Sequence, residues 1–200
     1  MHQMLTQQMN NPKPSQQEIE QMWLSLSFDR ITEVEIPISD VLEQLNKIGL
    51  AEFAKFRVSQ HWVLDWFGSL DRFEEIDFFQ KFLKSPSVIG SLTQLELKDT
   101  LPCGVLKLEP SSAFTFDGEV AKALYDGGAY SQYHISDREA KNFGIRLSDS
   151  LFSFRYSEVP IYRSSDAWSD WFYGIAWDIT WFGFDKRNYE CWLLCLTDTD

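Results

Sequence analysis

The chain ends in SSDAWSDWFYGIAWDITWFGFDKRNYECWLLCLTDTD, which spans residues 164–200 and decides the fold. Five of the eight tryptophans lie in this stretch. Two apolar runs, 175–184 and 189–196, flank a short polar segment whose length suits a connection between paired antiparallel strands. We therefore predict a C-terminal Trp-rich β-hairpin. Because it carries the largest aromatic surface of the chain, we expect it to be central to the core.

The first strand of this predicted hairpin is apolar on both sides. Alternation along a strand sends its isoleucines and tryptophans to one face and its phenylalanines to the other, which predicts a strand covered on both faces. Asp178 interrupts the second face. A carboxylate there needs a hydrogen-bonding or charged partner, and Arg155 and Arg163 are candidates for a structural pair. The alternative is that Asp178 lines a pocket.

Capping residues and helical spacing of apolar side chains predict five helices upstream of the hairpin. Ser15 precedes Glu18, Asp71 precedes Glu74, and Ser136 precedes Glu139, each with the spacing of a capping box. The predicted helices span residues 15–28, 39–49, 71–85, 117–127 and 136–151. Short apolar segments predict strands at 31–36, 92–97 and 105–108, an extended segment at 152–162, and either a helix or a strand within 50–67.

Helices and strands are not regularly interleaved in this pattern, which favours an α+β fold. We predict an antiparallel sheet that contains the C-terminal hairpin and packs against several helices. Residues 1–14 are polar, rich in Gln and Asn, and contain two prolines, so we expect a disordered N-terminal tail. Residues 15–200 are expected to form a single α+β domain, because one core commonly reaches this size.

The composition constrains the partner. Thirty acidic residues against 18 Lys and Arg give a formal net charge of −12. This balance argues against nucleic acid, whose phosphates are bound by clustered basic residues, and against an anionic membrane surface. A basic protein fits best, because complementary fields accelerate association. Under the alternative interpretation, the acidity serves only to maintain solubility.

No catalytic or cofactor-binding motif is present in the sequence. It contains no Gly-x-Ser-x-Gly elbow, no Walker A loop and no dinucleotide-binding glycine pattern, so nothing supports an enzymatic activity or a cofactor. The histidines and cysteines lack the spacing of zinc ligands. Cys191 and Cys195 point the same way on the predicted strand but lie about 13 Å apart, too far for a disulfide. Reduced thiols, and the absence of a signal-like N-terminus or a long apolar run, predict a cytoplasmic location.

Two groups of residues are candidates for binding. Trp168 and Trp171 alternate with Asp166 and Asp170, a mixture of aromatic anchors and charges that is typical of protein interfaces. The alternative places this segment as a core-facing turn beneath the hairpin. The second group is a carboxylate pocket around Asp178, Asp198 and Asp200, which could hold a hard cation such as Mg²⁺ or Ca²⁺. Its alternative is a solvated acidic terminus.

Four segments of the C-terminal half carry a family resemblance: 127–130 (GGAY), 167–172 (AWSDWF), 176–181 (AWDITW) and 194–200 (LCLTDTD). They resemble the corresponding segments of small bacterial proteins of unassigned function with a Trp-rich C-terminal hairpin. In general character, acidic, aromatic-rich and without a catalytic signature, the chain is also similar to immunity proteins that neutralise bacterial toxins. This second resemblance implies a partner-binding role and assigns no residues.

The sequence therefore predicts a bacterial cytoplasmic protein that binds another protein, such as a basic toxin domain, and blocks it sterically with the help of acidic side chains. Trp168 and Trp171 are the candidate anchors. The alternative function is a small-ligand-binding protein or a metal-dependent enzyme that uses the carboxylates of Asp178, Asp198 and Asp200.

Overall fold

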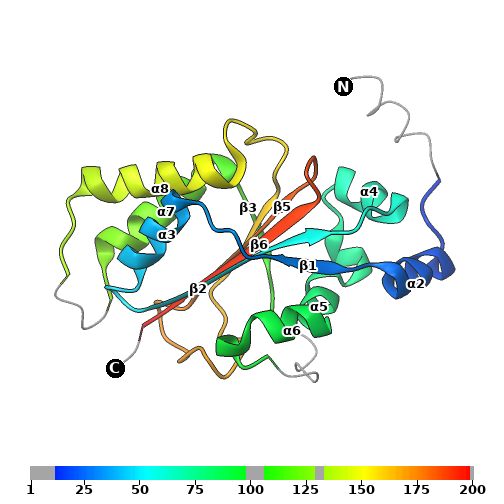
Figure 1. The fold of residues 1–200 in the computed structure, drawn as a ribbon, viewed down its shortest axis with the longest axis horizontal. Coiled ribbons are helices and arrows are strands. Elements are labelled where there is room, and N and C mark those ends of the chain that lie inside the picture. The colour runs from blue at the N-terminus through cyan, green and yellow to red at the C-terminus, as the bar shows by residue number, and fades with distance from the viewer. Residues whose placement is uncertain (1–11, 98–105, 129–132, 199–200) are drawn as a thin grey trace.

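The computed structural model describes residues 12–97, 106–128 and 133–198 (Figure 1). Its helices are α2 (Gln16–Ser25), α3 (Ile36–Leu45), α4 (Trp62–Ser69), α5 (Phe78–Leu83), α6 (Pro86–Ser91), α7 (Ala113–Asp126) and α8 (Asp137–Phe152), with 3₁₀ helices η1 (Phe73–Ile76) and η2 (Thr93–Leu95). Its strands are β1 (Phe28–Ile31), β2 (Leu50–Val58), β3 (Glu109–Ser111), β4 (Ile161–Ser164), β5 (Ile179–Asp185) and β6 (Glu190–Thr197).

All six strands join one antiparallel sheet in the order β1-β2-β6-β5-β4-β3. The last two strands form a hairpin that pairs Ile179 with Leu196 and Asp185 with Glu190. Since β6 lies between β2 and β5, the hairpin occupies the middle of the sheet. The predicted α+β fold and its C-terminal hairpin are confirmed. The first hairpin strand begins at Ile179 rather than at residue 175, because the preceding residues form a turn closed by Asp178.

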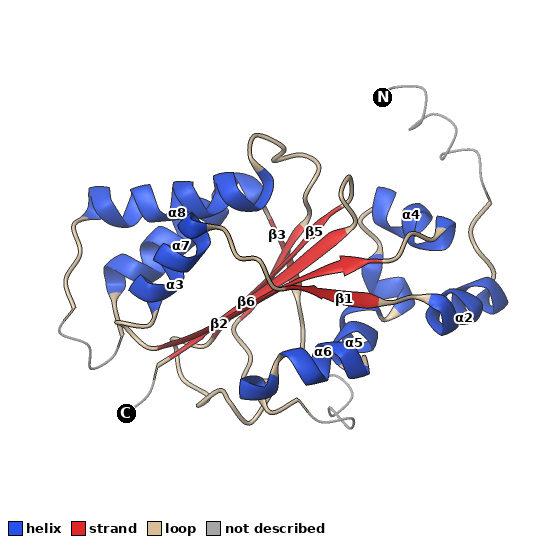
Figure 2. Ribbon diagram, in the orientation of Figure 1, coloured by secondary structure: helices blue, strands red, loops and turns tan. Residues whose placement is uncertain are grey.

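Helices cover both faces of the sheet (Figure 2). One hydrophobic cluster packs α3, α7 and α8 against the face that carries Trp181 and Trp192. The other packs α2, α4, α5 and α6 against the face that carries Phe182 and Phe184. This confirms the prediction that β5 is covered on both sides, which explains why its sequence shows no polar face.

Two of the three predicted capping boxes are present, whereas Asp71 caps no helix, because Arg72 precedes η1 and no side chain caps it. The Ser15 side chain accepts a hydrogen bond from the Glu18 backbone, and the Glu18 carboxylate accepts one from the Ser15 N–H at 2.8 Å. Ser136 and Glu139 repeat this arrangement at the start of α8. These reciprocal bonds satisfy backbone donors that a helix start otherwise leaves unpaired.

Two helix starts were predicted too late. Residues 31–36 are not a strand, because β1 ends at Ile31 and α3 already begins at Ile36, with Pro37 in its first turn. Proline is favoured there, since the missing N–H would be unpaired anyway, and Ser39 is therefore not the cap. Similarly, α7 starts at Ala113 rather than Asp117, because Ser112 accepts a hydrogen bond from the Phe114 N–H.

The helix predicted over 71–85 is broken into η1 and α5. Asp71 and Asp77 both adopt left-handed backbone conformations, with φ of 54° and 53°, which interrupt helical hydrogen bonding. The strand predicted over 92–97 is also wrong, because Pro86 begins α6 and η2 follows it. The ambiguous segment 50–67 contains both alternatives, β2 and then most of α4.

The remaining strand predictions were displaced. Within 105–108 only 106–108 are described, and the strand that follows is β3, from Glu109. The predicted extended segment 152–162 consists mostly of turns, and only its last residues join β4. Both β3 and β4 are too short for an alternation of apolar and polar residues to identify them in the sequence.

Residues 1–11 of the predicted tail lie outside the described residues. Of the three that are described, Pro14 is buried and Lys13 forms an ion pair of 2.7 Å with Glu75. No helix in the described part of the chain combines the length and apolar character needed to cross a membrane.

Candidate functional site

Asp178 is a structural carboxylate at the entrance to β5. Its side chain is 1% exposed. One carboxylate oxygen accepts hydrogen bonds from the backbone N–H groups of Gly174 at 2.7 Å and Ile175 at 3.0 Å, and the other accepts one from Thr197 Oγ1 at 2.5 Å. These three donors satisfy the carboxylate without a cation. They tie the turn before β5 to the end of β6.

The predicted partners of Asp178 are used elsewhere. Arg155 forms a bidentate ion pair with Asp185 at the far end of β5, with its two terminal guanidinium nitrogens 2.6 and 2.5 Å from the two carboxylate oxygens. Arg163 lies 3.7 Å from Glu119 of α7. Asp178 therefore has the hydrogen-bonding partners that the structural interpretation required, but these partners are two backbone amides and a threonine rather than an arginine.

Asp198 is buried just after β6. It is 5% exposed and packs against Gly128, just after α7, where an added Cβ would come within 2.8 Å of the carboxylate. Asp200 lies outside the described residues, so the pocket predicted around Asp178, Asp198 and Asp200 stays a prediction. Within residues 12–97, 106–128 and 133–198, no group of three His, Cys, Asp or Glu side chains is arranged to hold a metal ion.

The segments that carry the family resemblance meet at this end of the sheet. The Trp177 indole N–H donates to the Gly127 carbonyl at 2.7 Å, which ties the turn before β5 to the end of α7. Asp178 binds Thr197, and Asp198 packs against Gly128. The described contacts of these segments hold the fold together.

The predicted aromatic anchors differ in exposure. Trp168 is 2% exposed, and its indole N–H donates to Thr180 Oγ1 at 2.8 Å beneath the sheet. Trp171 is partly buried against Phe172. Asp166 and Asp170 are exposed, so the segment turns its tryptophans inward and these acidic side chains outward.

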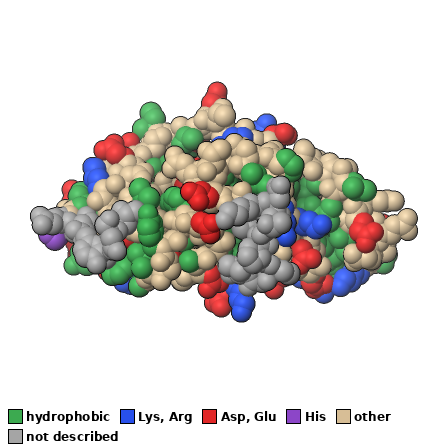
Figure 3. Space-filling model, turned by 90° about the horizontal axis from the view of Figure 1, so that it is seen from below, with side chains coloured by type: hydrophobic (Ala, Val, Ile, Leu, Met, Phe, Trp, Pro, Cys, Tyr) green, Lys and Arg blue, Asp and Glu red, His purple; other side chains and the backbone are tan. Residues whose placement is uncertain are grey.

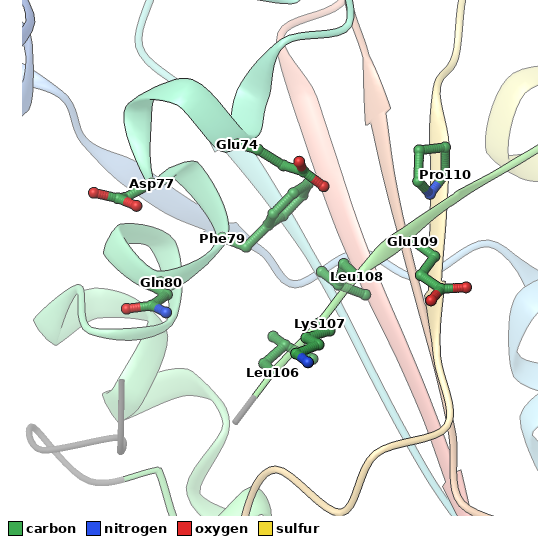
Figure 4. A pocket seen from close by; sticks show the side chains of 9 residues that line it. All are labelled: Glu74, Asp77, Phe79, Gln80, Leu106, Lys107, Leu108, Glu109 and Pro110. Atoms are coloured by element: carbon green, nitrogen blue, oxygen red, sulfur yellow. The ribbon is translucent and has the colours of Figure 1, made fainter. Parts of the chain in front are cut away.

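A pocket of about 390 Å³ lies near β3, at the edge of the sheet (Figure 4). One wall comes from residues 74–80 of η1 and α5, and the other from residues 106–110, which lead into β3. Glu74 and Phe79 project from the helical wall toward the opposite segment. Asp166, one of the predicted binding residues, lies beside this second wall and accepts a hydrogen bond from the Lys107 N–H at 3.4 Å.

The pocket combines apolar walls with uncompensated negative charge. Phe79, Leu106 and Leu108 supply apolar surface, and the carboxylates of Glu74, Asp77 and Glu109 outnumber the single ammonium of Lys107. Among the described residues, none of these three carboxylates forms a side-chain hydrogen bond or an ion pair.

The acidic residues next to the pocket, unlike those that line it, form ion pairs. Asp71 pairs with Lys186 at 2.6 Å, and Glu75 is bound by Lys13 and Arg72. Hydrogen bonds from these two basic side chains lower the pKa of Glu75. The 71–77 stretch therefore contains two paired carboxylates that support the fold and two, at the pocket, whose charge is available to a partner.

Tyr162 forms part of the buried layer next to this site. Its ring packs against Phe79 with centroids 4.7 Å apart. Burial, together with the negative charges of Asp71 and Glu74, raises the pKa of Tyr162. The phenol therefore stays neutral at physiological pH and adds no charge to the pocket.

Sequence reasoning missed this pocket. Its walls lie about 30 residues apart in the chain, and the predicted secondary structure was wrong for both. The available signal was the acidic run 71–77, from which we predicted only the start of a helix at Asp71.

No protein-family model matches the chain, and a search of curated proteins finds no match. The family resemblance of the C-terminal segments therefore stays a prediction. The site is described by its own geometry, which is that of a small acidic pocket with apolar walls.

Proposed function

We propose that this chain is a protein-binding module that recognises a basic protein partner, in the manner of an immunity protein that neutralises a bacterial toxin domain. The observation that carries the proposal is the pocket at the β3 edge, where Glu74, Asp77 and Glu109 have no counterion among the described residues. Unpaired carboxylates beside apolar surface provide both charge complementarity and contact area for a partner.

The charge of the whole molecule supports the same partner. A net charge of −12 creates a field that attracts basic proteins and accelerates their association. Figure 3 shows a face on which acidic and hydrophobic side chains are interspersed, as they are at many interfaces. Neutralisation would follow from steric occlusion, because the partner's basic active surface would lie against this chain.

We also propose a bacterial cytoplasmic location. Cys191 and Cys195 are buried free thiols. Burial raises the pKa of both, which keeps them protonated and unreactive. Reduced, inert thiols in a core are typical of cytoplasmic proteins.

The proposal is tested by affinity capture from the native lysate with three baits, followed by mass spectrometry. They are the wild type, the pocket variant E74Q/D77N/E109Q and the control variant D29N/E33Q/E35Q. Each variant removes three exposed carboxylates, so each changes the net charge from −12 to −9, since −12 + 3 = −9. We expect a stoichiometric basic protein on the wild type and the control, and its loss from the pocket variant.

Equal capture by all three baits would place the interface elsewhere, for example at Trp171 and Asp170. Failure of all three to capture a basic protein would contradict the proposed function.

The pocket also suits a second candidate function, binding of a small cationic ligand. Its volume of about 390 Å³ lies within the range of about 300–1,000 Å³ typical of ligand pockets. A thermal-shift screen of small organic cations and metal ions distinguishes this alternative, because a ligand that binds the folded protein raises the melting temperature, and the shift grows with the ratio of ligand concentration to Kd. The carboxylate site at Asp178, Asp198 and Asp200 stays a separate prediction, because Asp200 lies outside the described residues.

A further inference from the structure

The free edge of β3 lacks a hydrogen-bond donor that an added β-strand of a partner would need. The Phe184 N–H donates to the Pro160 carbonyl, so Pro160 uses its backbone to bond β5. Backbone groups alternate in direction along an antiparallel strand, so the next residue, Ile161, directs its N–H and C=O toward β3. Pro110 lies opposite Tyr162, one position further along, and therefore turns its backbone toward the free edge. Proline has no N–H to offer there, and it is a common means of protecting an edge strand. Recognition at this edge must therefore rely on side chains.

The adjoining pocket has the features of a receptor for one long basic side chain. Leu106, Leu108 and Phe79 line it with apolar surface that would cover a methylene stem. Glu74 and Phe79 both belong to the helical wall, and their side chains project from it into the space between the two walls (Figure 4). A cationic head group placed at Glu74 would be close to both a carboxylate and an aromatic ring.

We infer that this pocket receives an arginine side chain of the basic partner, an inference that rests on the proposed function. The guanidinium would bind the Glu74 carboxylate while its stem packs against Leu106 and Leu108. Asp77 and Glu109 would contribute negative charge at the rim.

Arginine fits this pocket better than lysine for geometric reasons. The planar guanidinium offers parallel N–H donors that match the two oxygens of a carboxylate, whereas an ammonium acts as a point charge. The guanidinium also stacks on aromatic rings and is more weakly hydrated, so it loses less on entering a partly apolar pocket. An acidic side chain would be repelled, and a purely apolar one would leave Glu74 without a partner.

The test uses the full-length protein and defined probes, so it does not depend on finding the partner. Acetyl-Gly-Arg-Gly-amide and acetyl-Gly-Lys-Gly-amide are titrated into protein with labelled leucine methyl groups and followed by NMR. We expect the arginine probe to shift the Leu106 and Leu108 methyl signals and to give intermolecular contacts between its δ-methylene group and the Phe79 ring. The lysine probe should bind several-fold more weakly.

The E74Q variant keeps the shape of the pocket and removes one charge, so it should bind the arginine probe about tenfold more weakly. E33Q is the matched control, because Glu33 is exposed between β1 and α3, and it should bind like the wild type. Unchanged spectra of both variants without probe would show that they remain folded.

Three outcomes would overturn the inference: no localised shifts, equal binding of the two probes, or equal affinity of E74Q and the wild type. If a basic protein is captured but the arginine probe does not bind, the proposed function is supported and the arginine inference is contradicted. If the arginine probe binds but no basic protein is captured, the arginine site is supported and the proposed function is contradicted.

Discussion

At the residue scale, Asp178 shows what a buried carboxylate next to an apolar strand requires. The sequence established that it needed a partner, and the structure supplies Gly174, Ile175 and Thr197. Those partners could not be predicted, because they depend on how the turn before β5 closes and where β6 ends. The sequence shows that a buried carboxylate needs hydrogen-bond donors, but it does not show which residues provide them.

Removing this carboxylate should destabilise the protein. Asp178→Ala loses three hydrogen bonds to a charged acceptor and leaves buried donors unpaired, so we expect the free energy of unfolding to fall by about 3 kcal/mol. Urea denaturation measures this change. The exposed Asp166→Asn is the control, with an expected change of less than about 0.5 kcal/mol. A similarly small effect for Asp178→Ala would contradict the structural role.

Asp185 should give the protein a specific sensitivity to acid. Burial by itself would raise the pKa of Asp185, but hydrogen bonds from Arg155 and from the Asn188 backbone outweigh it and hold the pKa below its ordinary value. A lowered folded-state pKa stabilises the fold above the ordinary value near 3.8, and this contribution is lost as the pH falls through the folded-state pKa.

The measurement compares the wild type with Asp185→Asn by urea denaturation from pH 7 to pH 3. At pH 7 the variant should be less stable by about 3 kcal/mol, because Arg155 loses its buried counterion. That difference should begin to shrink as the pH falls through about 3.8, where the carboxylate of the unfolded chain becomes protonated, and it should continue to shrink toward the lower folded-state pKa. A difference that stays constant across the range would show that Asp185 does not act through its charge.

At the element scale, the hairpin and two helix starts were predictable, because each depends on a local pattern. Long apolar runs around a short polar break identified β5 and β6, and Ser-Glu spacing identified the starts of α2 and α8. The helix predicted over 71–85 failed although Asp71 and Glu74 have the same spacing. Asp71 and Asp77 bend the chain through left-handed conformations, which few sequence signals announce.

The pairing of β5 with β6 depends on a glycine. Gly183 lies opposite Trp192, and an added Cβ would come within 2.3 Å of the indole ring. Gly183→Ala should therefore cost about 3 kcal/mol in unfolding free energy, because the buried Trp192 has no space into which to move.

Gly90→Ala is the matched control for this substitution. Gly90 lies in α6 with open space where a Cβ would be, so alanine should be neutral or stabilise the protein by up to about 1 kcal/mol. Thermal and urea denaturation of the two variants decide the point. Equal stability of both variants would show that Trp192 does not pack on Gly183 as described.

At the scale of the whole molecule, composition favours a basic partner but does not indicate where such a partner would bind. The net charge of −12 favours a basic partner wherever the interface lies. The pocket depends on η1 and α5 meeting the segment before β3, and this meeting is a product of the sheet order. The aromatic residues that suggested an interface were misleading in part, since Trp168 fills the core instead.

The central claim is that a basic protein binds at the β3 edge through the acidic pocket. Hydrogen exchange of the protein, alone and with the captured partner, tests it most directly because it maps the contact along the chain. We predict slower exchange of amides in residues 74–80 and 106–111, and a loss of that protection when the salt concentration is raised, since salt screens exposed charges. Protection confined to other segments, or unaffected by salt, would contradict the claim.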